Sequence, residues 1–314
     1  MNKFYLTLVG AFFALCASAQ YDQFETGYRN GEWYLDSTYV INANGIRTDF
    51  EEYEYQNGRL VGINSVYMSD FEDGVPDYIE HTKTVLNHTA DGKVGQVEIS
   101  LKDETGTYVL SATIEFAYNG AGLVESAVYQ GIDEENPDAG IQPFTKTVYV
   151  KYNGDVAEDT EFYSWDEESK EWVKYGTAHS DIVNGQIVKI THTEEMMGFS
   201  ITTETTYQYD SHGYTTYEKV STGGFGFTTK TETSYENTYD ANDNIYTIKE
   251  SIDGGDPTTT YHFWSREGGT SIQMVKSAID AATQWYDISG RRLNGAPSHP
   301  GIFIHNGKKT VIRK

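Results

Sequence analysis

Residues 201–251 read ITTETTYQYDSHGYTTYEKVSTGGFGFTTKTETSYENTYDANDNIYTIKES. The pair Tyr209-Asp210 returns as Tyr239-Asp240, 30 residues later. Each pair ends a run rich in Thr, Tyr and Glu, and a turn built from Ser, His, Gly, Asn or Asp follows it. Such runs between such turns are typical of β-strands, because branched and aromatic side chains fit a pleated surface. The stretch therefore predicts two copies of one β-hairpin unit.

Turn signals of the same kind recur along most of the chain. They fall at Asn57-Gly58, Asp91-Gly92, Asn119-Gly120, Asn153-Gly154, Asn184-Gly185, His212-Gly213 and Asp243-Asn244, with spacings of 28 to 34 residues. Asn-Gly and Asp-Gly are strong hairpin signals because both central residues of a type I′ turn need positive φ. Longer turns lie between them, at residues 70–77, 103–106, 131–140, 166–171, 194–198, 222–226 and 253–257. One period of about 30 residues thus holds two strands, and we expect the two sets of turns at opposite ends of each unit.

Alternating side chains indicate the faces of these strands. Apolar residues share one face at Val97, Ile99 and Leu101, and after the next turn at Tyr108, Leu110, Ala112, Ile114 and Phe116. Over residues 201–209 the two faces no longer differ in polarity, because Thr, Tyr and Glu fill the alternating positions. Such a pattern is typical of a sheet with solvent on both faces. Repeats of this kind bury apolar faces only against their neighbours. We predict an all-β fold, an antiparallel meander of hairpins over residues 20–265 that forms an extended or curled sheet, with a small C-terminal β module.

The charge and composition of the 314-residue chain restrict its partners. The net charge of −24 provides no positive field for nucleic acid or an anionic membrane. The hydrophobic fraction of 38% predicts a thin core or wet sheet faces. The single cysteine, Cys16, lies in the leader described next. A disulfide framework, a thiolate metal site and a cysteine nucleophile are therefore not expected in the mature chain.

Residues 1–19 have the layout of a secretory signal peptide. Lys3 precedes an apolar run, and residues 17–19 (Ala-Ser-Ala) form a small-residue cleavage site. The apolar run is too short to span a bilayer, so we expect cleavage after Ala19 and no membrane span in the mature chain. Lipidation of Cys16 is the weaker alternative, because the residues before it fit the lipoprotein pattern poorly.

The turn motifs resemble those of a known class of secreted proteins. Residues 207–213 read Tyr-Gln-Tyr-Asp-Ser-His-Gly, and residues 239–244 read Tyr-Asp-Ala-Asn-Asp-Asn. These strings resemble the tyrosine-aspartate (YD, RHS-like) repeats of large secreted bacterial proteins. Together with Trp-Asp-Glu-Glu-Ser-Lys-Glu-Trp at 165–172, they also resemble hairpin-repeat proteins that Bacteroidetes export. The resemblance covers turns and flanking aromatics over residues 50–265, and it implies an architecture without implying an activity.

The composition changes after residue 265. Residues 266–284 are predicted to be a linker, and the chain becomes basic over residues 285–314. This last segment resembles the C-terminal sorting domain of the type IX secretion system, a small β module that the secretion machinery recognises at the outer membrane. The sorting residues that the resemblance implies are Tyr286, Asp287, Gly290, Arg291, Arg292, Gly301, Gly307, Lys308 and Lys309. The familiar domain has more strands upstream, and the other interpretation is a last repeat whose lysines protect an edge strand.

The chain shows no recognisable catalytic or metal-binding motif, so we predict no enzyme activity, no cofactor and no metal. Residues 240–244 have the oxygen spacing that opens a calcium loop, but Ile245 stands where the loop needs Gly and Ser251 where it needs Glu. An Asx-rich turn without an ion is the favoured interpretation. The histidines are scattered, and adjacent acidic residues on a strand point to opposite faces.

Aromatic residues around one loop form the candidate ligand site. Tyr163, Trp165, Trp172 and Tyr175 flank the loop at residues 166–171. A platform of this kind beside carboxylates suits sugar stacking, whereas Trp165 and Trp172 are equally well placed to close a hairpin as a cross-strand pair. We favour the pair, because packing explains periodic aromatics without a ligand.

Together these features predict a protein that is secreted or displayed on the cell surface. Its expected role is binding, adhesion or structure, with an extracellular glycan or protein as ligand. An extracellular polysaccharide hydrolase is the first alternative. An outer-membrane β-barrel is the second, and it ranks low because strands with Thr, Glu and Lys on both faces would expose charge to lipid at several kcal/mol each.

Overall fold

The computed structural model describes residues 29–72, 75–133, 136–196, 198–224, 226–266, 285–287, 292–293, 301–305 and 308–312. The chain divides into two units, residues 1–268 and 269–314, and each is described by itself. The leader predicted at residues 1–19, and the predicted linker apart from Arg266, lie outside the described residues. No helix in the described part of the chain is long and apolar enough to cross a membrane.

The first unit consists of β-strands, with a turn of 3₁₀ helix at Pro137–Ala139. The strands are β1 (Arg29–Asn30), β2 (Trp33–Ile41), β3 (Arg47–Gln56), β4 (Arg59–Glu72), β5 (Val75–His88), β6 (Val94–Lys102), β7 (Tyr108–Tyr118), β8 (Val124–Ile132), β9 (Ile141–Asn153), β10 (Val156–Asp166), β11 (Glu171–Val183), β12 (Gln186–Met196), β13 (Phe199–Tyr209), β14 (Thr215–Gly224), β15 (Phe227–Tyr239), β16 (Ile245–Ile252) and β17 (Thr258–Ser265). The Thr- and Tyr-rich runs of the sequence are therefore strands, as their composition predicts.

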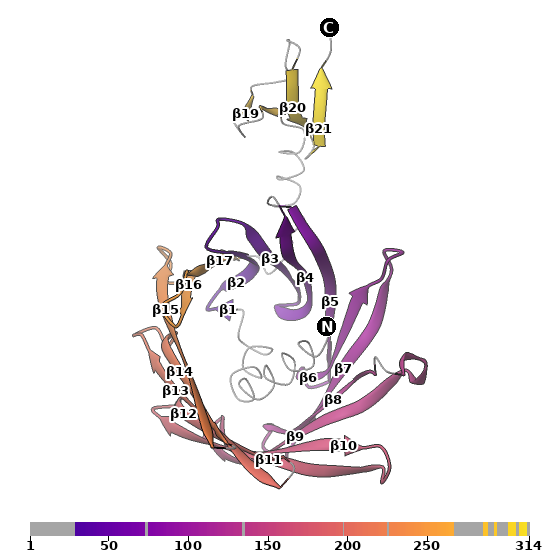
Figure 1. Cartoon of the computed structure of the whole chain (residues 1–314), viewed down its shortest axis with the longest axis vertical. Helices are drawn as coiled ribbons and strands as arrows, with labels where there is room; N and C mark the ends of the chain where they lie inside the picture. Colours follow the sequence, from indigo (N-terminus) through magenta and orange to yellow (C-terminus); the bar gives the residue numbers. More distant parts are fainter. Residues whose placement is uncertain are drawn as a thin grey trace. The chain divides into compact units, whose positions relative to one another are not determined.

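The sheet of the first unit closes on itself. Each strand from β2 to β16 pairs antiparallel with the next, and β17 pairs with β2 from Ser265 opposite Tyr34 to Thr259 opposite Ile41. Figure 1 shows β17 and β2 together at this seam. Strands β2 to β17 thus form a closed 16-stranded antiparallel barrel. The predicted extended or curled sheet is wrong, because the first and last strands satisfy each other's N–H and C=O groups, which an open sheet leaves unpaired.

The two sets of turns lie at opposite ends of this barrel. Loops alternate between the ends because neighbouring strands run in opposite directions. The base is the end where β2 begins and β17 ends, and it holds the β3–β4 loop and every second loop up to β15–β16. The mouth is the other end, from the β2–β3 loop to the β16–β17 loop. The first set of turns is at the base and the longer set is at the mouth, as their spacing predicts.

The base turns differ in their geometry, and two of them show the contrast. Asn57-Gly58 is a two-residue loop in which φ is 53° and 76°, as a type I′ turn requires. At Asp91-Gly92 only Gly92 has positive φ, at 91°, and the loop is wider. Its backbone is closed by hydrogen bonds to Thr89, whose carbonyl accepts the N–H of Gly92 at 2.9 Å. The type I′ prediction therefore holds at the first position and is wrong at the second, where a longer loop uses one glycine.

Strand register separates an inner face of the barrel from an outer face. Val97 and Ile114 pair across β6 and β7, and they are 1% and 4% exposed. On the same face, Thr205 of β13 is 2% exposed. This buried set marks the interior, because side chains crowd on the concave side of a barrel and spread apart on the convex side. A bulge between β6 and β7 turns Tyr108 and Leu110 outward, so the prediction that they share the apolar face is wrong.

Aromatic side chains fasten neighbouring strands together at the base. Tyrosine hydroxyls donate to backbone carbonyls on the preceding strand, and we call these contacts tyrosine latches: Tyr55 to Leu35, Tyr118 to Val94, Tyr152 to Val124 and Tyr209 to Ile187, at 2.6 to 3.0 Å. Trp264 makes the equivalent contact through its indole N–H, which donates to Ile245 at 2.7 Å. The repeated aromatic of the sequence therefore has a structural role, because it satisfies a carbonyl at the end of the sheet.

The second unit holds a small antiparallel sheet. Its strands are β18 (Trp285–Asp287), β19 (Arg292–Leu293), β20 (Gly301–His305) and β21 (Lys308–Ile312), in the order β19-β18-β20-β21. The predicted sorting residues within these strands are Tyr286, Asp287, Arg292, Gly301, Lys308 and Lys309. Gly290, Arg291 and Gly307 lie outside the described residues. The C-terminal segment thus contains β structure, and its recognition by secretion machinery stays a prediction.

Candidate functional site

Two carboxylates lie on the inner face of neighbouring hairpins, Glu218 on β14 and Glu250 on β16. Tyr235 of β15 lies opposite Glu250, and Thr233, two residues before it, lies opposite Glu218. Residues two apart on a strand share a face, and Thr233 is buried. The register therefore places both carboxylates and the Tyr235 ring together on the inner wall.

The cross-strand neighbours of these carboxylates are hydroxylated side chains. Glu218 lies opposite Tyr207 and Thr233, and Glu250 lies opposite Tyr235 and Thr258. None of these four positions carries a basic residue. Hydroxyl groups can donate hydrogen bonds to a carboxylate, but they bring no compensating positive charge. The register positions opposite both carboxylates thus leave the negative charges uncompensated.

Lysines of β14, β15 and β16, and of β11 and β12 in the same sheet, point to the outer wall. The outward positions are Lys174, Lys189, Lys219, Lys230 and Lys249. Lys219 Nζ lies 2.6 Å from Glu232 Oε1, and Lys249 Nζ lies 3.1 Å from Glu236 Oε2. These four side chains are 37 to 75% exposed. The outer wall therefore carries paired charges at positions open to water, where such pairs contribute little to stability.

Burial shifts the pKa values of the titratable side chains on the inner wall. It raises the pKa of Glu218, and the charge of Glu250 raises that pKa further. It also raises the pKa of Glu250 itself. Burial lowers the pKa of His192, against the charge of Glu194, and lowers the pKa of His262 to about 4. Ionising the inner carboxylates is therefore costly, and a cation on the inner wall would favour their charged form.

The inner wall is open to solvent near the mouth. Thr229 and Thr231 of β15 lie opposite Thr222 and Val220, and both β15 residues are exposed. They belong to the same face as the buried Thr233, closer to the mouth. Exposure thus rises along the inner face of β15 from its middle toward the mouth. A ligand that enters from the mouth reaches polar threonine side chains first.

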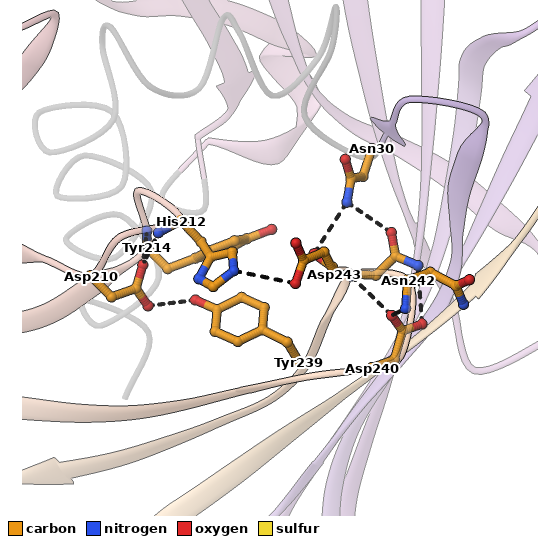
Figure 2. Close-up of polar contacts among 9 residues, drawn as sticks. Asn30, Asp210, His212, Tyr214, Tyr239, Asp240, Asn242 and Asp243 are labelled. Atoms are coloured by element: carbon orange, nitrogen blue, oxygen red, sulfur yellow. Dashed lines mark hydrogen bonds and ion pairs between the residues drawn. The ribbon is translucent and has the colours of Figure 1, made fainter.

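The turn at residues 240–244 has the oxygen spacing that opens a calcium loop. In the structure it is held by hydrogen bonds within the chain. Asp240 Oδ1 accepts the backbone N–H groups of Asn242 and Asn244 at 2.7 and 3.0 Å. Asn30 of β1 donates its amide to Asn244 Oδ1 at 2.9 Å and to the Asp243 carbonyl at 3.3 Å (Figure 2). These are the bonds of an Asx turn, the interpretation that the sequence favours.

Tyr239 joins this turn to the preceding one, as Figure 2 shows. Its hydroxyl donates to Asp210 Oδ2, and its ring stacks on His212 with centroids 3.9 Å apart. His212 Nε2 in turn lies 3.4 Å from Asp243 Oδ1. Asp210 also caps its own turn, where Oδ1 accepts the backbone N–H of His212 at 2.9 Å. The repeated Tyr-Asp pair is thus structural, because the Asp closes one turn and the Tyr of the next repeat bonds to it.

The four aromatic residues predicted around residues 166–171 do not form one platform. Trp165 and Trp172 are direct cross-strand partners, with ring centroids 5.1 Å apart and planes at 65°. This arrangement is the cross-strand pair that the packing interpretation describes. Tyr163 shares their outer face. Tyr175 lies beside the β10–β11 bulge, and its ring is 6.2 Å from the buried inner ring of Phe162. Of these four residues, Trp165 alone lines the cavity that is described below.

Among the described residues, Glu158, Asp159 and His179 have the chemistry of metal ligands, and their ligand atoms lie within 4.8 Å of one another. They already bond within the chain. His179 Nδ1 lies 2.7 Å from Asp159 Oδ1, and Lys151 donates to Glu158 at 2.6 Å. The hydrogen bond to Asp159 raises the pKa of His179, which favours the protonated ring that cannot bind a metal. We assign no metal to this group.

Glu218 and Glu250 were not singled out from the sequence. The signal was available, because each is adjacent to a lysine, in Glu218-Lys219 and Lys249-Glu250. Adjacent strand residues point to opposite faces, so these pairs separate acid from base across the sheet. The sequence does not reveal which of the two faces is the interior.

The fold defines a closed, up-and-down antiparallel β-barrel built from repeated hairpins. No protein-family model and no curated protein matches the sequence. A solved porin-like protein from Bacteroides uniformis is 12% identical with a TM-score of 0.45, and the match covers 74% of this chain and 98% of that chain. A DUF3836 family protein from Parabacteroides distasonis is 22% identical with a TM-score of 0.25, covering 30% and 82%. The Photorhabdus luminescens Tc holotoxin pore is 12% identical with a TM-score of 0.26, covering 84% and 18%.

The closed sheet changes the ranking of the functions expected from the sequence. Closure is the architecture that an outer-membrane barrel requires, and it supports this second alternative better than an adhesive open sheet. The resemblance noted in the sequence implies an all-β protein of repeated hairpins, and the fold agrees with that architecture. The hydrolase and the type IX route stay predictions.

Proposed function

We propose that the chain is an exported β-barrel of the cell surface that binds a cationic ligand against its inner wall. The separation of charge across a single sheet supports this proposal, with Glu218 and Glu250 inside and lysine–glutamate pairs outside. An ionised carboxylate that is taken out of water costs several kcal/mol unless it is paired. The raised pKa of each inner carboxylate reflects that cost, and a bound cation offsets it.

Calorimetric titration of the mature chain with Ca²⁺, spermidine and trilysine tests this proposal. We expect at least one of these cations to bind, and the Glu218→Gln/Glu250→Gln double variant to lose that binding. The matched control is Glu232→Gln/Glu236→Gln, which removes the same charge from the outer wall of β15, the strand between β14 and β16. Equal loss in the two variants would show nonspecific attraction to an acidic protein. That result, or no binding of any of the three cations, would overturn the proposal.

An outer-membrane barrel is the second candidate, and the closure of the sheet favours it. The outer ion pairs oppose it, because a lysine on the lipid face near the bilayer midplane costs about 2–4 kcal/mol. Lys219 and Lys249 are examples of outward residues that would meet lipid in that arrangement. Alkaline carbonate extraction of membranes from producing cells distinguishes the two. We expect release into the soluble fraction, whereas retention in the membrane pellet would favour the second candidate.

We further propose that residues 285–314 direct the chain through the type IX route. The supporting observations are the basic composition, the quoted motif residues and the small sheet of β18 to β21. Cell fractionation with and without residues 285–314 tests this. We expect the truncated chain to stay in the periplasm, and an unchanged surface location would refute the sorting role.

A further inference from the structure

A cavity of about 290 Å³ lies at the mouth, between the β8–β9 loop and the end of β10. Two aromatic side chains line it, Phe144 and Trp165, together with Pro143. The rest of the lining consists of Ala139 and four polar side chains: Asp133, Asn136, Gln142 and Glu167. The volume is near the lower end for ligand pockets, which start at about 300 Å³. The cavity therefore has the size for a sugar unit or two, and it is separate from the inner carboxylates in sequence and strand.

The two aromatic side chains that line this cavity each pack on another aromatic residue outside the lining. Trp165 is fixed by its cross-strand partner Trp172, which does not line the cavity, at a centroid distance of 5.1 Å. Phe144 packs on Tyr129 with centroids 6.0 Å apart. Rings that are already oriented lose little conformational entropy when a ligand stacks on them. Trp165 thus offers a preorganised apolar surface at the edge of the barrel.

The loops that carry the polar groups are also closed by hydrogen bonds. Gln142 donates its amide to the carbonyl of Ala139 at 2.7 Å, which directs the amide oxygen away from that bond. Asp166 Oδ1 accepts the backbone N–H and the hydroxyl of Ser169, at 2.7 and 2.9 Å, and so closes the loop that carries Glu167. Amide and carboxylate oxygens are acceptors for hydroxyl donors. The lining therefore offers several acceptors beside an aromatic ring.

We propose that this mouth pocket binds a neutral saccharide, with Trp165 as the stacking surface and Gln142, Asn136 and Glu167 as partners for its hydroxyl groups. A sugar ring has apolar C–H faces and a polar rim, which is the chemistry that an aromatic ring beside amides and carboxylates complements. Among the described residues that line the cavity, Asp133 and Glu167 are acidic and none is basic. Lys170 pairs with Glu167 from outside the lining, so the charge of Asp133 is the one that disfavours an anionic sugar. The site is independent of the inner-wall cation site and stands if that site fails.

Tryptophan fluorescence and calorimetry of the mature chain test the pocket, with maltose, cellobiose, lactose and N,N′-diacetylchitobiose as probes. We expect saturable binding of at least one disaccharide. Trp165→Ala should weaken that binding at least tenfold, and Trp165→Phe should weaken it less, because the smaller ring still stacks. Gln142→Ala should also weaken it at least threefold. Circular dichroism confirms that each variant folds.

Trp33→Phe is the matched control, since Trp33 lies at the base in contact with Arg266, 4.8 Å from the ring centroid, and should leave affinity unchanged. No binding of any of the four disaccharides at millimolar concentration would overturn the proposal. So would unchanged affinity in Trp165→Ala. Binding that is lost in Glu218→Gln/Glu250→Gln but kept in Trp165→Ala would place the sugar inside the barrel and would also overturn the assignment to the mouth pocket.

Discussion

The replacement Tyr239→Phe tests the contact between repeats at the base. It removes one hydroxyl and keeps the ring that stacks on His212 at 3.9 Å. The lost hydrogen bond joins residues 29 positions apart in sequence and ends on the Asp210 carboxylate. Hydrogen bonds to charged groups contribute about 1.5–3 kcal/mol. Asp210 keeps the amide of Asn237, which donates at 2.9 Å, so we expect a loss of about 2 kcal/mol in the free energy of unfolding.

Tyr163→Phe provides the matched control, because it removes the same bond type from a local, half-buried contact on the outer wall. The Tyr163 hydroxyl donates to Glu161, two residues away on the same strand, at 2.5 Å. We expect a change below about 0.5 kcal/mol for this surface replacement. Urea unfolding followed by tryptophan fluorescence at pH 7 gives both values. Equal effects of the two replacements, or no cost for Tyr239→Phe, would refute the role of the Tyr-Asp contact.

The same experiment has a defined pH dependence. Burial acts to raise the pKa of Asp210, but the hydrogen bonds from Tyr239 and Asn237 outweigh it, and the pKa lies below its usual value. A carboxylate with a lowered folded pKa contributes stability above its unfolded pKa of about 3.9 and loses it as the pH falls through the folded pKa. The cost of Tyr239→Phe should therefore shrink in acid. A cost that is constant from pH 7 down to acid unfolding would contradict this.

Three further predictions concern a turn, the core and the inner wall. Gly92→Ala should destabilise by more than about 1 kcal/mol in urea unfolding, because φ is 91° and a Cβ would meet the Arg59 guanidinium at 2.2 Å; Gly120→Ala, with nothing within 4 Å, should be near neutral. Val97→Ala should cost about 2 kcal/mol in the same assay, since Val97 is 1% exposed. Glu218→Gln should stabilise the ligand-free barrel at pH 7 and have little effect below about pH 4, because a raised carboxylate pKa penalises folding as the pH rises; thermal unfolding that moves the opposite way at pH 7 would contradict it.

Local features of the fold could be predicted from the sequence. Asn57-Gly58 marks a hairpin because the two residues take positive φ without strain, and this property does not depend on distant contacts. The alternation around Val97 likewise marks one buried face. Leu110 was assigned to the wrong face because a bulge shifts the register by one residue, and no residue type in that strand signals a bulge.

Closure of the barrel was the feature that local patterns could not supply. The seam joins β17 to β2, strands from opposite ends of the unit, and the pairing of Thr260 with Val40 has no turn between them to signal it. The Thr-rich strands also hid which face of the sheet is buried. Thr205 looks like a residue of a wet sheet, yet it is buried inside the barrel. The candidate site depends on the same distinction, because Glu218 becomes an inner residue only once the concave side is known.

The even number of strands has a mechanical consequence. Sixteen antiparallel strands return the chain to the end where it started, so Tyr34 and Ser265 are direct partners at the base. Tension applied between the two termini would pull these strands apart at one end of the seam and break the β17–β2 pairs one after another, starting there. Strands pulled from opposite ends would instead resist with all their hydrogen bonds at once. A barrel under load from its own termini is therefore expected to unzip at the seam at low force, while the tyrosine latches hold the hairpins on either side together.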